Sequence, residues 1–388
     1  MDRSRFDELY PTNKKYRRFD QRNTAFELSR KKGDIPFSYD FEEERVKRIS
    51  KGAYGYTLLD YAFKDAAGLY ETIPNQKGGM DTGFYSWKPL IDRKQSILDR
   101  WKGSPEEASR IVAKVAKYFG AVGVGFCELD ERWVYSHSSE GREIVFEDVE
   151  EGYLTEAKAV IPKSHKWVVA MTVPMEFEEN SFAPTVLDVT SNMGYSRMHI
   201  LAGQVAEFIR GIGYHAIPMG NDTALSVPIA IQAGLGHAGR HGRLITWEYG
   251  PLVRICKIFT DLPLKPSSLA LEGIIEFCEV CEKCARHCPS GAIPFGPRTW
   301  EGRCKANNPG VLKWYSDEEA CFDYWSKVGS GCTICFRVCS FTKPKGFIHD
   351  MVKWFIRNMP HLNRLWVWMD EHLGYGKIGN PGRYWKED

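Results

Sequence analysis

Apolar residues recur at helical spacing in three stretches of the middle of the chain. The first follows a capping box at residues 104–107 and ends at Gly120, with an apolar stripe of Ile111, Val112 and Val115. The second covers 194–210 and ends at Gly211, with inward positions Ile200, Val205, Phe208 and Ile209. A third runs from about Thr223 to Ala233. Each pattern predicts a helix with one buried face.

Short apolar runs separate these helices and predict buried strands at 121–126, 168–175, 214–219 and within 253–264. The alternation of strand and helix indicates an α/β (α+β) core over residues 89–274. A charged and uneven stretch predicts an insertion in this core at about 116–164. Residues 1–88 have weak periodicity, so we expect an irregular N-terminal unit that wraps the core.

Composition limits the classes of function. Lys and Arg number 52 against 50 Asp and Glu, and no basic stripe stands out, so we expect no nucleic-acid partner. The many aromatic residues (12 Trp, 21 Phe and 18 Tyr) are explained by ordinary packing or by a dry, aromatic-walled pocket. No apolar run reaches the ~18 residues of a membrane-spanning helix. The polar N-terminus lacks the apolar segment of a secretory signal, which fits a cytoplasmic protein or a mature chain.

Nine of the eleven cysteines lie between 278 and 339, and eight of these nine form two runs with iron–sulfur spacing. The first run is CxxCxxCxxxCP, from Cys278 to Pro289, and the second extends from Cys321 to Cys339. In two-cluster ferredoxins the fourth cysteine of such a run ligates the other cluster. The crossed arrangement predicts two [4Fe–4S] sites in a ferredoxin-like domain at 275–345, followed by a C-terminal wrap at 346–388. The first set is Cys278, Cys281, Cys284 and Cys339, and the second set is Cys288, Cys321, Cys332 and Cys335.

Zinc is the alternative ligand for paired CxxC motifs, although the CxxCxxCxxxCP run favours clusters. Cys304 lies outside both sets and is interpreted as an ordinary thiol, and Cys127 and Cys256 as core residues of strands. A two-cluster ferredoxin is far shorter than this chain, so the residues before Cys278 are expected to hold another redox group or a substrate site. No G-x-G-x-x-G follows a predicted strand, so a Rossmann nucleotide site has no support, and a flavin without a motif stays open.

With these motifs in place, residues 180–388 resemble the corrinoid-dependent reductive dehalogenases of the tetrachloroethene type. The resemblance rests on Tyr195, Ala206, Ile209-Arg210 and Gly213-Tyr214, on AGLGHAGRHGRLITWEYGPLVRICKIFTDLPL (233–264), on CFDYWSKVGSGCTICFRVC (321–339) and on LGYGKIGNPGRYW (373–385). It implies a nitroreductase-like core that binds base-off cobalamin, and the sequence lacks the D-x-H-x-x-G motif of other B12 enzymes. It also implies that electrons pass from the second cysteine set to the first set and then to cobalt.

The resemblance assigns a catalytic role to three residues. Tyr195 matches the family's proton donor, and the spacing of Asn221 and Arg254 from it matches residues that line the same site. A phenol is a poor acid at neutral pH, and a neighbouring guanidinium stabilises its ionised form, so Arg254 would assist proton release. Contacts with the corrinoid are expected from Asn192, Met193 and the Gly-rich loop 234–242, through His237, Arg240 and His241. A surface loop is the alternative reading of 234–242.

Other functions stay open at this point. Asp188 is a competing acid, and the related epoxyqueuosine reductases use cobalamin, two clusters and an aspartic acid. A non-catalytic electron-transfer or corrinoid-carrying protein is a second alternative.

For the dehalogenase, a neutral Asn221 favours a small chlorinated alkene or alkane over a phenolate. Expected partners are this organohalide, an external electron donor, a small membrane-anchor subunit and a second copy in a homodimer. The expected location is the outer face of the cytoplasmic membrane, after removal of a twin-arginine signal, with the cytoplasm as the alternative.

Overall fold

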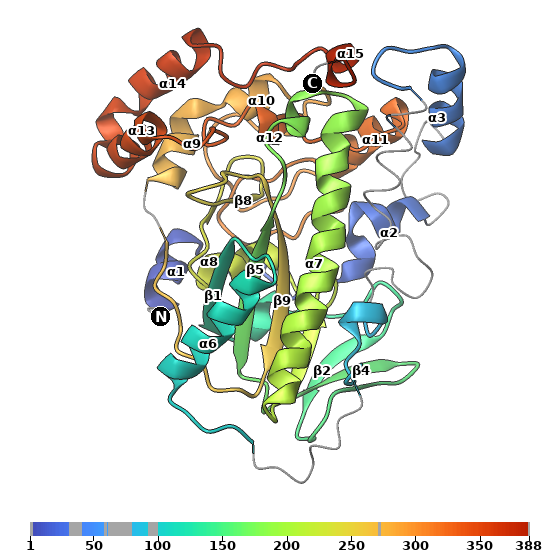
Figure 1. The fold of residues 1–388 in the computed structure, drawn as a ribbon, viewed down its shortest axis with the longest axis vertical. Coiled ribbons are helices and arrows are strands. Elements are labelled where there is room, and N and C mark those ends of the chain that lie inside the picture. The colour runs from blue at the N-terminus through green and yellow to red at the C-terminus, as the bar shows by residue number, and fades with distance from the viewer. Residues whose placement is uncertain are drawn as a thin grey trace.

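The computed structural model, which describes residues 3–30, 41–57, 60, 80–91, 100–270 and 273–386, is built around a four-stranded antiparallel sheet (Figure 1). The strand order is β1 (Gly123–Glu128), β5 (Trp167–Pro174), β9 (Val253–Thr260) and β6 (Ala216–Met219). All three pairings are antiparallel, with Met171 opposite Cys256 in the β5–β9 pair. The predicted strands are therefore present, and the mixed core is α+β rather than an alternating parallel sheet.

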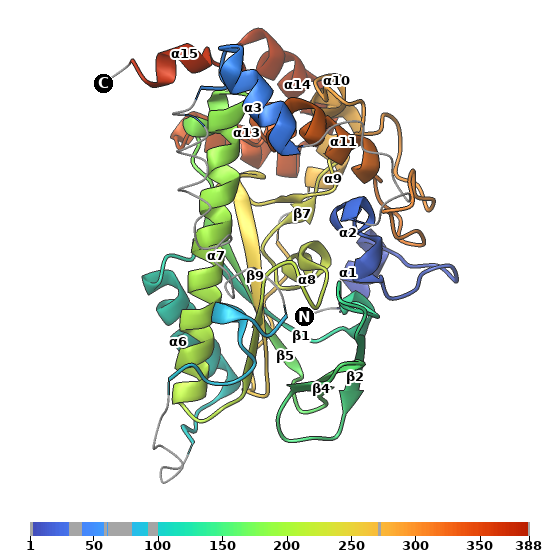
Figure 2. The same ribbon diagram turned by 90° about the vertical axis from the view of Figure 1, so that its right-hand side faces the viewer.

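Helices cover both faces of this sheet. α6 (Pro105–Tyr118) and α7 (Thr185–Gly211) lie on one face, and α8 (Ser226–Gln232) lies on the other (Figure 2). Side chains of β5 alternate between the two faces: Val169 and Met171 pack with α6 and α7, whereas Val168 and Ala170 pack with α8. Because both faces are covered, the central strands β5 and β9 are largely apolar, with Arg254 and Lys257 as the charged residues of β9.

α7 is longer than the sequence predicted. It begins at Thr185 rather than at 194, because the β-branched run at 185–190 hides its helical spacing. The extra turns place Asp188, Ser191 and Asn192 on the same face of the helix as Tyr195, at intervals of three and four residues. This face points toward the C-terminal cysteine motifs and organises the site described below.

The insertion in the core is smaller than expected. α6 continues to Tyr118 and β1 belongs to the central sheet, so the predicted boundary at 116 is wrong and the insertion starts after Glu128. It contains a separate sheet of order β2 (Glu143–Glu147), β4 (Lys158–Pro162) and β3 (Tyr153–Leu154), and the 3-10 turn η4 (Glu131–Trp133). The loop after α8 forms a third small sheet, β7 (His237–Ala238) with β8 (Leu244–Ile245).

The N-terminal unit contains regular elements where it is described. These are α1 (Arg3–Leu9), η1 (Gln21–Asn23), α2 (Ala25–Arg30), α3 (Phe41–Ser50) and η2 (Gly83–Tyr85). Thr12 bridges to Val311, and Arg18 donates hydrogen bonds to the carbonyls of Val134 and Ile144. The segment therefore ties the core to the C-terminal motifs, as a wrapping unit would. Part of the predicted unit at 1–88 lies outside the described ranges given above.

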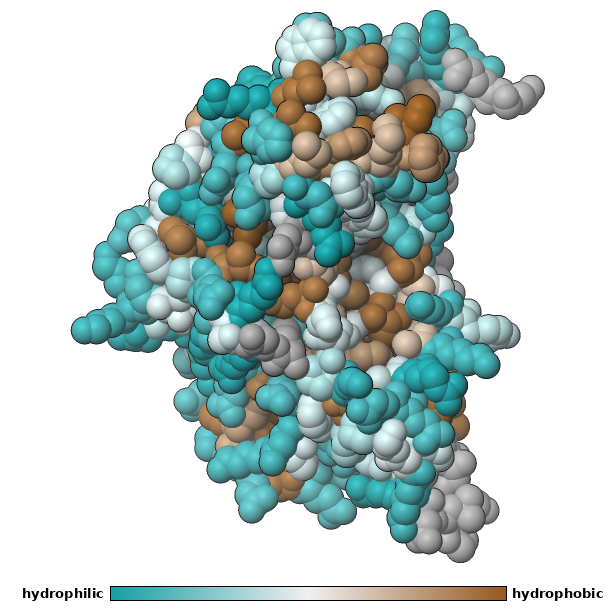
Figure 3. All heavy atoms as spheres, turned by 90° about the vertical axis from the view of Figure 1, so that its left-hand side faces the viewer, coloured by the Kyte–Doolittle hydropathy of each residue, from teal (hydrophilic) through white to brown (hydrophobic). Residues whose placement is uncertain are grey.

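The C-terminal part is helical and caps one end of the sheet (Figure 1). Its helices are α9 (Ile274–Cys281), α10 (Lys283–Arg286), α11 (Glu318–Val328), α12 (Ile334–Arg337), α13 (Phe347–Asn358), α14 (Asn363–His372) and α15 (Pro381–Tyr384). Two further 3-10 turns are η5 (Glu179–Ser181) and η6 (Pro360–Leu362). Apolar side chains gather in the upper part of the face shown in Figure 3. On α13, Phe347 and Trp354 are exposed. No helix in the described ranges is both long enough and apolar enough to span a bilayer.

Candidate active site

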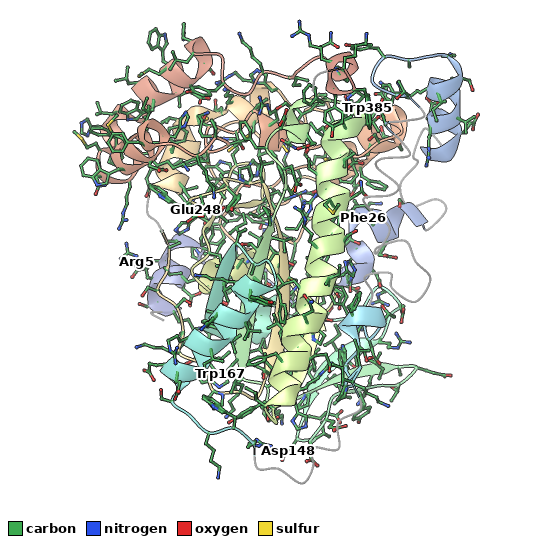
Figure 4. The ribbon with its side chains drawn as sticks, in the orientation of Figure 1. Arg5, Phe26, Asp148, Trp167, Glu248 and Trp385 are labelled. Atoms are coloured by element: carbon green, nitrogen blue, oxygen red, sulfur yellow. The ribbon has the colours of Figure 1, made fainter. Side chains whose placement is uncertain are left out.

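A cavity of about 800 Å³ lies between the core, the N-terminal unit and the C-terminal motifs. This volume is within the range of small-molecule and cofactor pockets. The aromatic wall expected from composition is present here. It is formed by Phe6, Tyr10, Tyr16, Phe19, Phe26, Trp133, Tyr135, Tyr195, Trp314, Phe322 and Trp325. Figure 4 labels Phe26, which packs against Phe322 with ring centroids 4.7 Å apart.

The structure brings Tyr195, Asn221 and Arg254 together on the wall of this cavity. Asn221 donates from Nδ2 to the phenolic oxygen of Tyr195 at 3.2 Å. The guanidinium of Arg254 stands 4.7 Å from the centroid of the Tyr195 ring, in cation–π geometry. Since Asn221 donates to this oxygen, the oxygen accepts there and its own proton is left to point elsewhere. Tyr195 comes from α7, Asn221 from the turn that follows β6, and Arg254 from β9.

Small neighbours allow Arg254 to lie against α7. A Cβ at Gly194 would stand 2.8 Å from Cγ of Arg254, so glycine is required for this approach. Nη2 of Arg254 donates to the hydroxyl of Ser191 at 2.7 Å, one helical turn before Tyr195. The guanidinium is thereby fixed between the two residues rather than left in solvent.

A buried lysine holds the turn that carries Asn221. Lys257, which is 0% exposed on β9, donates from Nζ to the carbonyl of Gly220 and to the hydroxyl of Ser226 at 3.0 Å. Asp222 accepts from the amide of Gly220 at 2.9 Å, and Thr223 adopts a positive φ of 65°. Burial lowers the pKa of Lys257 to about 8, although Asp222 opposes this shift. The turn is thus built around a cation inside the core, which sequence inspection missed because the residue sits in an apolar strand.

The cysteines gather into the two predicted sets. Cys278, Cys281, Cys284 and Cys339 line a small cavity of about 20 Å³. Cys288, Cys321, Cys332 and Cys335 line a larger one of about 260 Å³. Among the residues that the structure describes, no three His, Cys, Asp or Glu side chains stand close enough to hold a single metal ion. The two cavities nevertheless group the cysteines as the crossed pairing predicts. The ligand role of these cysteines stays a prediction.

The thiols of both sets lie in places that disfavour their ionised form. Burial raises the pKa of Cys278, Cys321 and Cys332 to about 12, and neighbouring cysteines add to the shift. Metal binding requires thiolates, and the positive charge of bound iron compensates for their burial. Four convergent cysteines in each cavity fit such a cluster chemically.

The order of the two sets relative to Tyr195 differs from the expectation. The cavity of the second set is also lined by Tyr195, Asn221 and Arg254, whereas none of these residues lines the cavity of the first set. The resemblance implied that the first set is nearer to the active site, so this order is reversed. The reason is that the face of α7 that carries Tyr195 packs against the loop that holds Cys332.

The residues expected to contact a corrinoid separate into two groups. Asn192 lines the 800 Å³ cavity, and Met193 does not. His237, Arg240 and His241 also lie away from it. The loop instead contributes Ala238, Gly239, Gly242 and Arg243 to the wall. Arg240, which is 1% exposed, donates to the carbonyls of Cys278, Glu279, Pro294 and Gly296. It holds the loop of the first cysteine set, and the burial of this loop shows that the surface-loop alternative is wrong. Arg240 does not line the large cavity, and its contact with a corrinoid stays a prediction.

Asp188 also lines the cavity, but its carboxylate is engaged. It accepts from the amide of Gly331 at 2.9 Å and from the hydroxyl of Ser330 at 3.4 Å. A Cβ at Gly331 would stand 2.3 Å from Oδ1 of Asp188, so the loop before Cys332 can approach only because residue 331 is glycine. This geometry gives Asp188 a structural task in joining α7 to the second cysteine set.

An ion pair missed by sequence inspection lies between the large cavity and the second set. Arg243 donates to both carboxylate oxygens of Glu318, at 2.9 and 2.7 Å, and both residues line both cavities. Burial opposes ionisation of Glu318, but Arg243 keeps the pKa of this carboxyl below its ordinary value. Glu318 lies one helical turn before Cys321, and this spacing was the signal available in the sequence.

The three remaining cysteines behave as expected. Cys127 and Cys256 are fully buried in the core on β1 and β9, and burial raises the pKa of the Cys256 thiol to about 12. Cys304 packs with Ala25, Ala306 and Phe322, outside both cysteine cavities.

Comparisons with known proteins identify relatives of the chain. A family model described as a reductive dehalogenase subunit matches residues 138–264. The chain is 40% identical over 399 residues to tetrachloroethene reductive dehalogenase of Sulfurospirillum multivorans, covering 93% of this chain and 79% of that protein. It is 35% identical to the enzyme of the same name from Desulfitobacterium hafniense, covering 78% of this chain and 60% of the relative.

A solved structure supports the fold. A reductive dehalogenase whose structure suggests a mechanism for B12-dependent dehalogenation superposes with a TM-score of 0.69 at 21% identity, over 96% of this chain and 48% of that one. The chain thus spans about half the length of this solved relative. Similarity to epoxyqueuosine reductase of Bacillus subtilis, at 29% identity, covers only 31% of this chain.

Proposed function

The chain belongs to the reductive dehalogenase family, and from this membership we propose that it replaces a halogen of a small organohalide by hydrogen. The observation that carries the proposal is the arrangement at Tyr195, whose hydroxyl accepts from Asn221 beside the guanidinium of Arg254. These groups stand where the large cavity and the cavity of the second cysteine set share a wall. A proton donor is thus positioned between a cofactor-sized space and a cluster-sized one.

The large cavity fits a corrinoid by its walls as well as its size. Besides the aromatic rings, four buried polar atoms on its wall have no hydrogen-bond partner among the described residues. They are Oε1 of Gln21, Nε1 of Trp133, Nε of Arg254 and Nε1 of Trp325. A flat ligand edged with amides, such as base-off cobalamin, offers both donors and acceptors to such atoms. When bound, the reduced corrinoid supplies the electrons that cleave the carbon–halogen bond.

Tyr195 supplies the proton that replaces the halogen. Its phenolic oxygen accepts the amide proton of Asn221, which directs the phenolic hydrogen toward the cavity. As that hydrogen leaves, negative charge develops on the oxygen, and the guanidinium of Arg254 stabilises it. Ser191 keeps the guanidinium in place through its hydrogen bond to Nη2.

The cysteine sets bind the two [4Fe–4S] clusters that carry electrons from an external donor. We assign the last step before the large cavity to the second set, because its cavity includes Tyr195 and Arg254. The first set then receives electrons from the donor and passes them to the second set. The Arg243–Glu318 pair spans the wall between the second set and the large cavity.

The proposed substrate is a small neutral chlorinated alkene or alkane. Asn221 provides an uncharged amide beside Tyr195, and the aromatic side chains named above line the same cavity. The two most similar relatives described above are named for tetrachloroethene, which is a substrate of this kind. A phenolate would leave its charge without a cationic partner at position 221.

Anaerobic reconstitution with cobalamin, iron and sulfide tests the proposal. Electron paramagnetic resonance is expected to show base-off Co(II) and two cubane signals, and reduced viologen is expected to support halide release from tetrachloroethene. Cluster signals without cobalamin uptake would contradict the proposal and favour an electron-transfer protein. Cobalamin uptake with turnover of epoxyqueuosine, and not of organohalides, would favour the other alternative.

A further inference from the structure

His241 is a buried side chain between the two cysteine sets. It is 3% exposed and lines both the cavity of the first set and the cavity of the second set. No other histidine in the described part of the chain lines either cavity. The residue therefore sits on the wall that the two proposed clusters share.

The backbone determines which ring nitrogen of His241 carries the proton. The amide of Arg243 donates to Nδ1 of His241 at 3.1 Å, so Nδ1 is an acceptor and holds no hydrogen. With Nδ1 unprotonated, the ring is neutral. A neutral imidazole with a bare Nδ1 carries its hydrogen on Nε2.

Nε2 of His241 is a donor without an acceptor. It is buried and has no hydrogen-bond partner within the described part of the chain. Leaving a buried donor unpaired costs ~1–3 kcal/mol, so such groups are almost always satisfied by something. The walls around it carry apolar side chains, including Ile245, Phe277 and Phe336, whose ring centroid lies 5.6 Å from that of His241. They also carry cysteines and polar side chains, but none of the described polar groups accepts a hydrogen bond from Nε2.

We propose that His241 donates a hydrogen bond from Nε2 to a sulfur of one of the two iron–sulfur clusters. This inference rests on the clusters of the proposed function. Hydrogen bonds to cluster sulfurs raise the reduction potential, because they stabilise the more negative reduced state. A hydrogen bond from His241 to one cluster therefore changes the difference in reduction potential between the two clusters.

Two substitutions separate the hydrogen bond from simple packing. His241→Leu removes the hydrogen-bond donor and replaces the imidazole with an apolar side chain of similar size. His241→Gln retains an amide N–H at a reach close to that of Nε2. His237→Gln is the matched control, because this histidine is on the same loop, is 2% exposed, and meets Tyr10 and the carbonyl of Ala270 rather than either cysteine cavity.

The measurement is a redox titration of the reconstituted protein, followed by electron paramagnetic resonance. A lost hydrogen bond worth ~1.4 kcal/mol changes the reduced-to-oxidised ratio about tenfold, which is ~59 mV for one electron. In His241→Leu we expect one cluster to shift by about this amount to a more negative potential, with iron content unchanged. His241→Gln should recover most of the shift, and His237→Gln should leave both potentials unchanged.

The outcomes distinguish this inference from the proposed function. If the unsubstituted protein takes up no clusters, the proposed function fails. If it takes up two clusters and His241→Leu leaves both potentials unchanged, the hydrogen bond is disproved and the proposed function stands. An equal shift in the Leu and Gln variants would also overturn it, because packing and not donation would then be responsible.

Discussion

The guanidinium of Arg254 stands over the ring of Tyr195, 4.7 Å from its centroid, and joins the central strand β9 to the long helix α7. The same arginine donates to Ser191 on α7, and Gly194 leaves room for its side chain. Because the guanidinium is already held in place, it stabilises negative charge on the phenolic oxygen without having to reorganise when that charge develops. The relationship accounts for why proton release is assigned to Tyr195 and not to Asp188, whose carboxylate is bound by the loop before Cys332.

Tyr195→Phe is expected to lower kcat for dechlorination by ~10²–10⁴, the usual contribution of a positioned acid. Cobalamin and iron content should not change, because the lost hydroxyl contacts only Asn221 in the described structure. Steady-state halide release and cofactor analysis check this. Tyr214→Phe is the control, since its hydroxyl donates to the carbonyl of Trp101 at 3.0 Å, away from the cavity. Undiminished turnover in Tyr195→Phe would rule out this residue as the donor.

Serine substitutions of the cysteines test the crossed pairing. Cys278→Ser and Cys339→Ser should perturb the same cluster signal, although 61 positions separate them, because both line the smaller cavity. Cys288→Ser and Cys332→Ser should perturb the other signal. Electron paramagnetic resonance of the reconstituted variants makes the comparison, with Cys304→Ser as the control. Matching signals from Cys284→Ser and Cys288→Ser, with neither resembling Cys339→Ser, would show that ligation follows the sequence runs.

Gly331→Ala is expected to lower the stability of the folded protein and the occupancy of the cluster bound by the second cysteine set. The new methyl group would meet Oδ1 of Asp188 at 2.3 Å, and overpacking of this kind costs ~1–3 kcal/mol. The urea midpoint and the iron content should both fall. Gly346→Ala is the control, because a Cβ there meets only Nδ1 of His349 at 3.8 Å. Adding Asp188→Ser to Gly331→Ala should restore part of the stability, and its failure to do so would disprove the clash.

Lys257 is expected to make the free energy of unfolding depend on pH in the alkaline range. Burial lowers its pKa from 10.5 to about 8 in the folded protein. Between these values the unfolded chain binds a proton that the folded chain has lost, so the free energy of unfolding rises as pH rises from 8 to 10.5. The gain is on the order of 3 kcal/mol at full deprotonation.

Lys257→Met isolates this contribution, because every other titrating group is common to both proteins. The difference in urea stability, unsubstituted minus variant, should increase over pH 8 to 10.5 and level off below pH 8. A difference that is constant across this range would mean that the lysine keeps an ordinary affinity for protons in the core.

Sequence patterns predicted the strands and the body of each core helix. A buried strand leaves a short apolar run in the sequence, and a helix with one buried face leaves apolar residues at helical spacing. They were less reliable where two signals compete. The β-branched run at 185–190 obscured the start of α7. The bounds given to the insertion, 116–164, overlapped the helix and the strand that were predicted before residue 127. The antiparallel pairing of the central sheet was also hidden, since pairing is made between segments far apart along the chain.

The sequence by itself predicted the two sets of cysteines, because ligand spacing is contained in short segments. It predicted the three residues of the proposed active site only through the family resemblance of the segments that carry them. Only the tertiary structure decided which set lies beside Tyr195, what Arg240 and Asp188 hold, and that His241 presents an unpaired donor between the sets. These depend on the packing of α7 against the loop before Cys332 and of the loop at 237–245 against α9. Contacts of that kind arise from the shape of the whole core, and no local spacing encodes them.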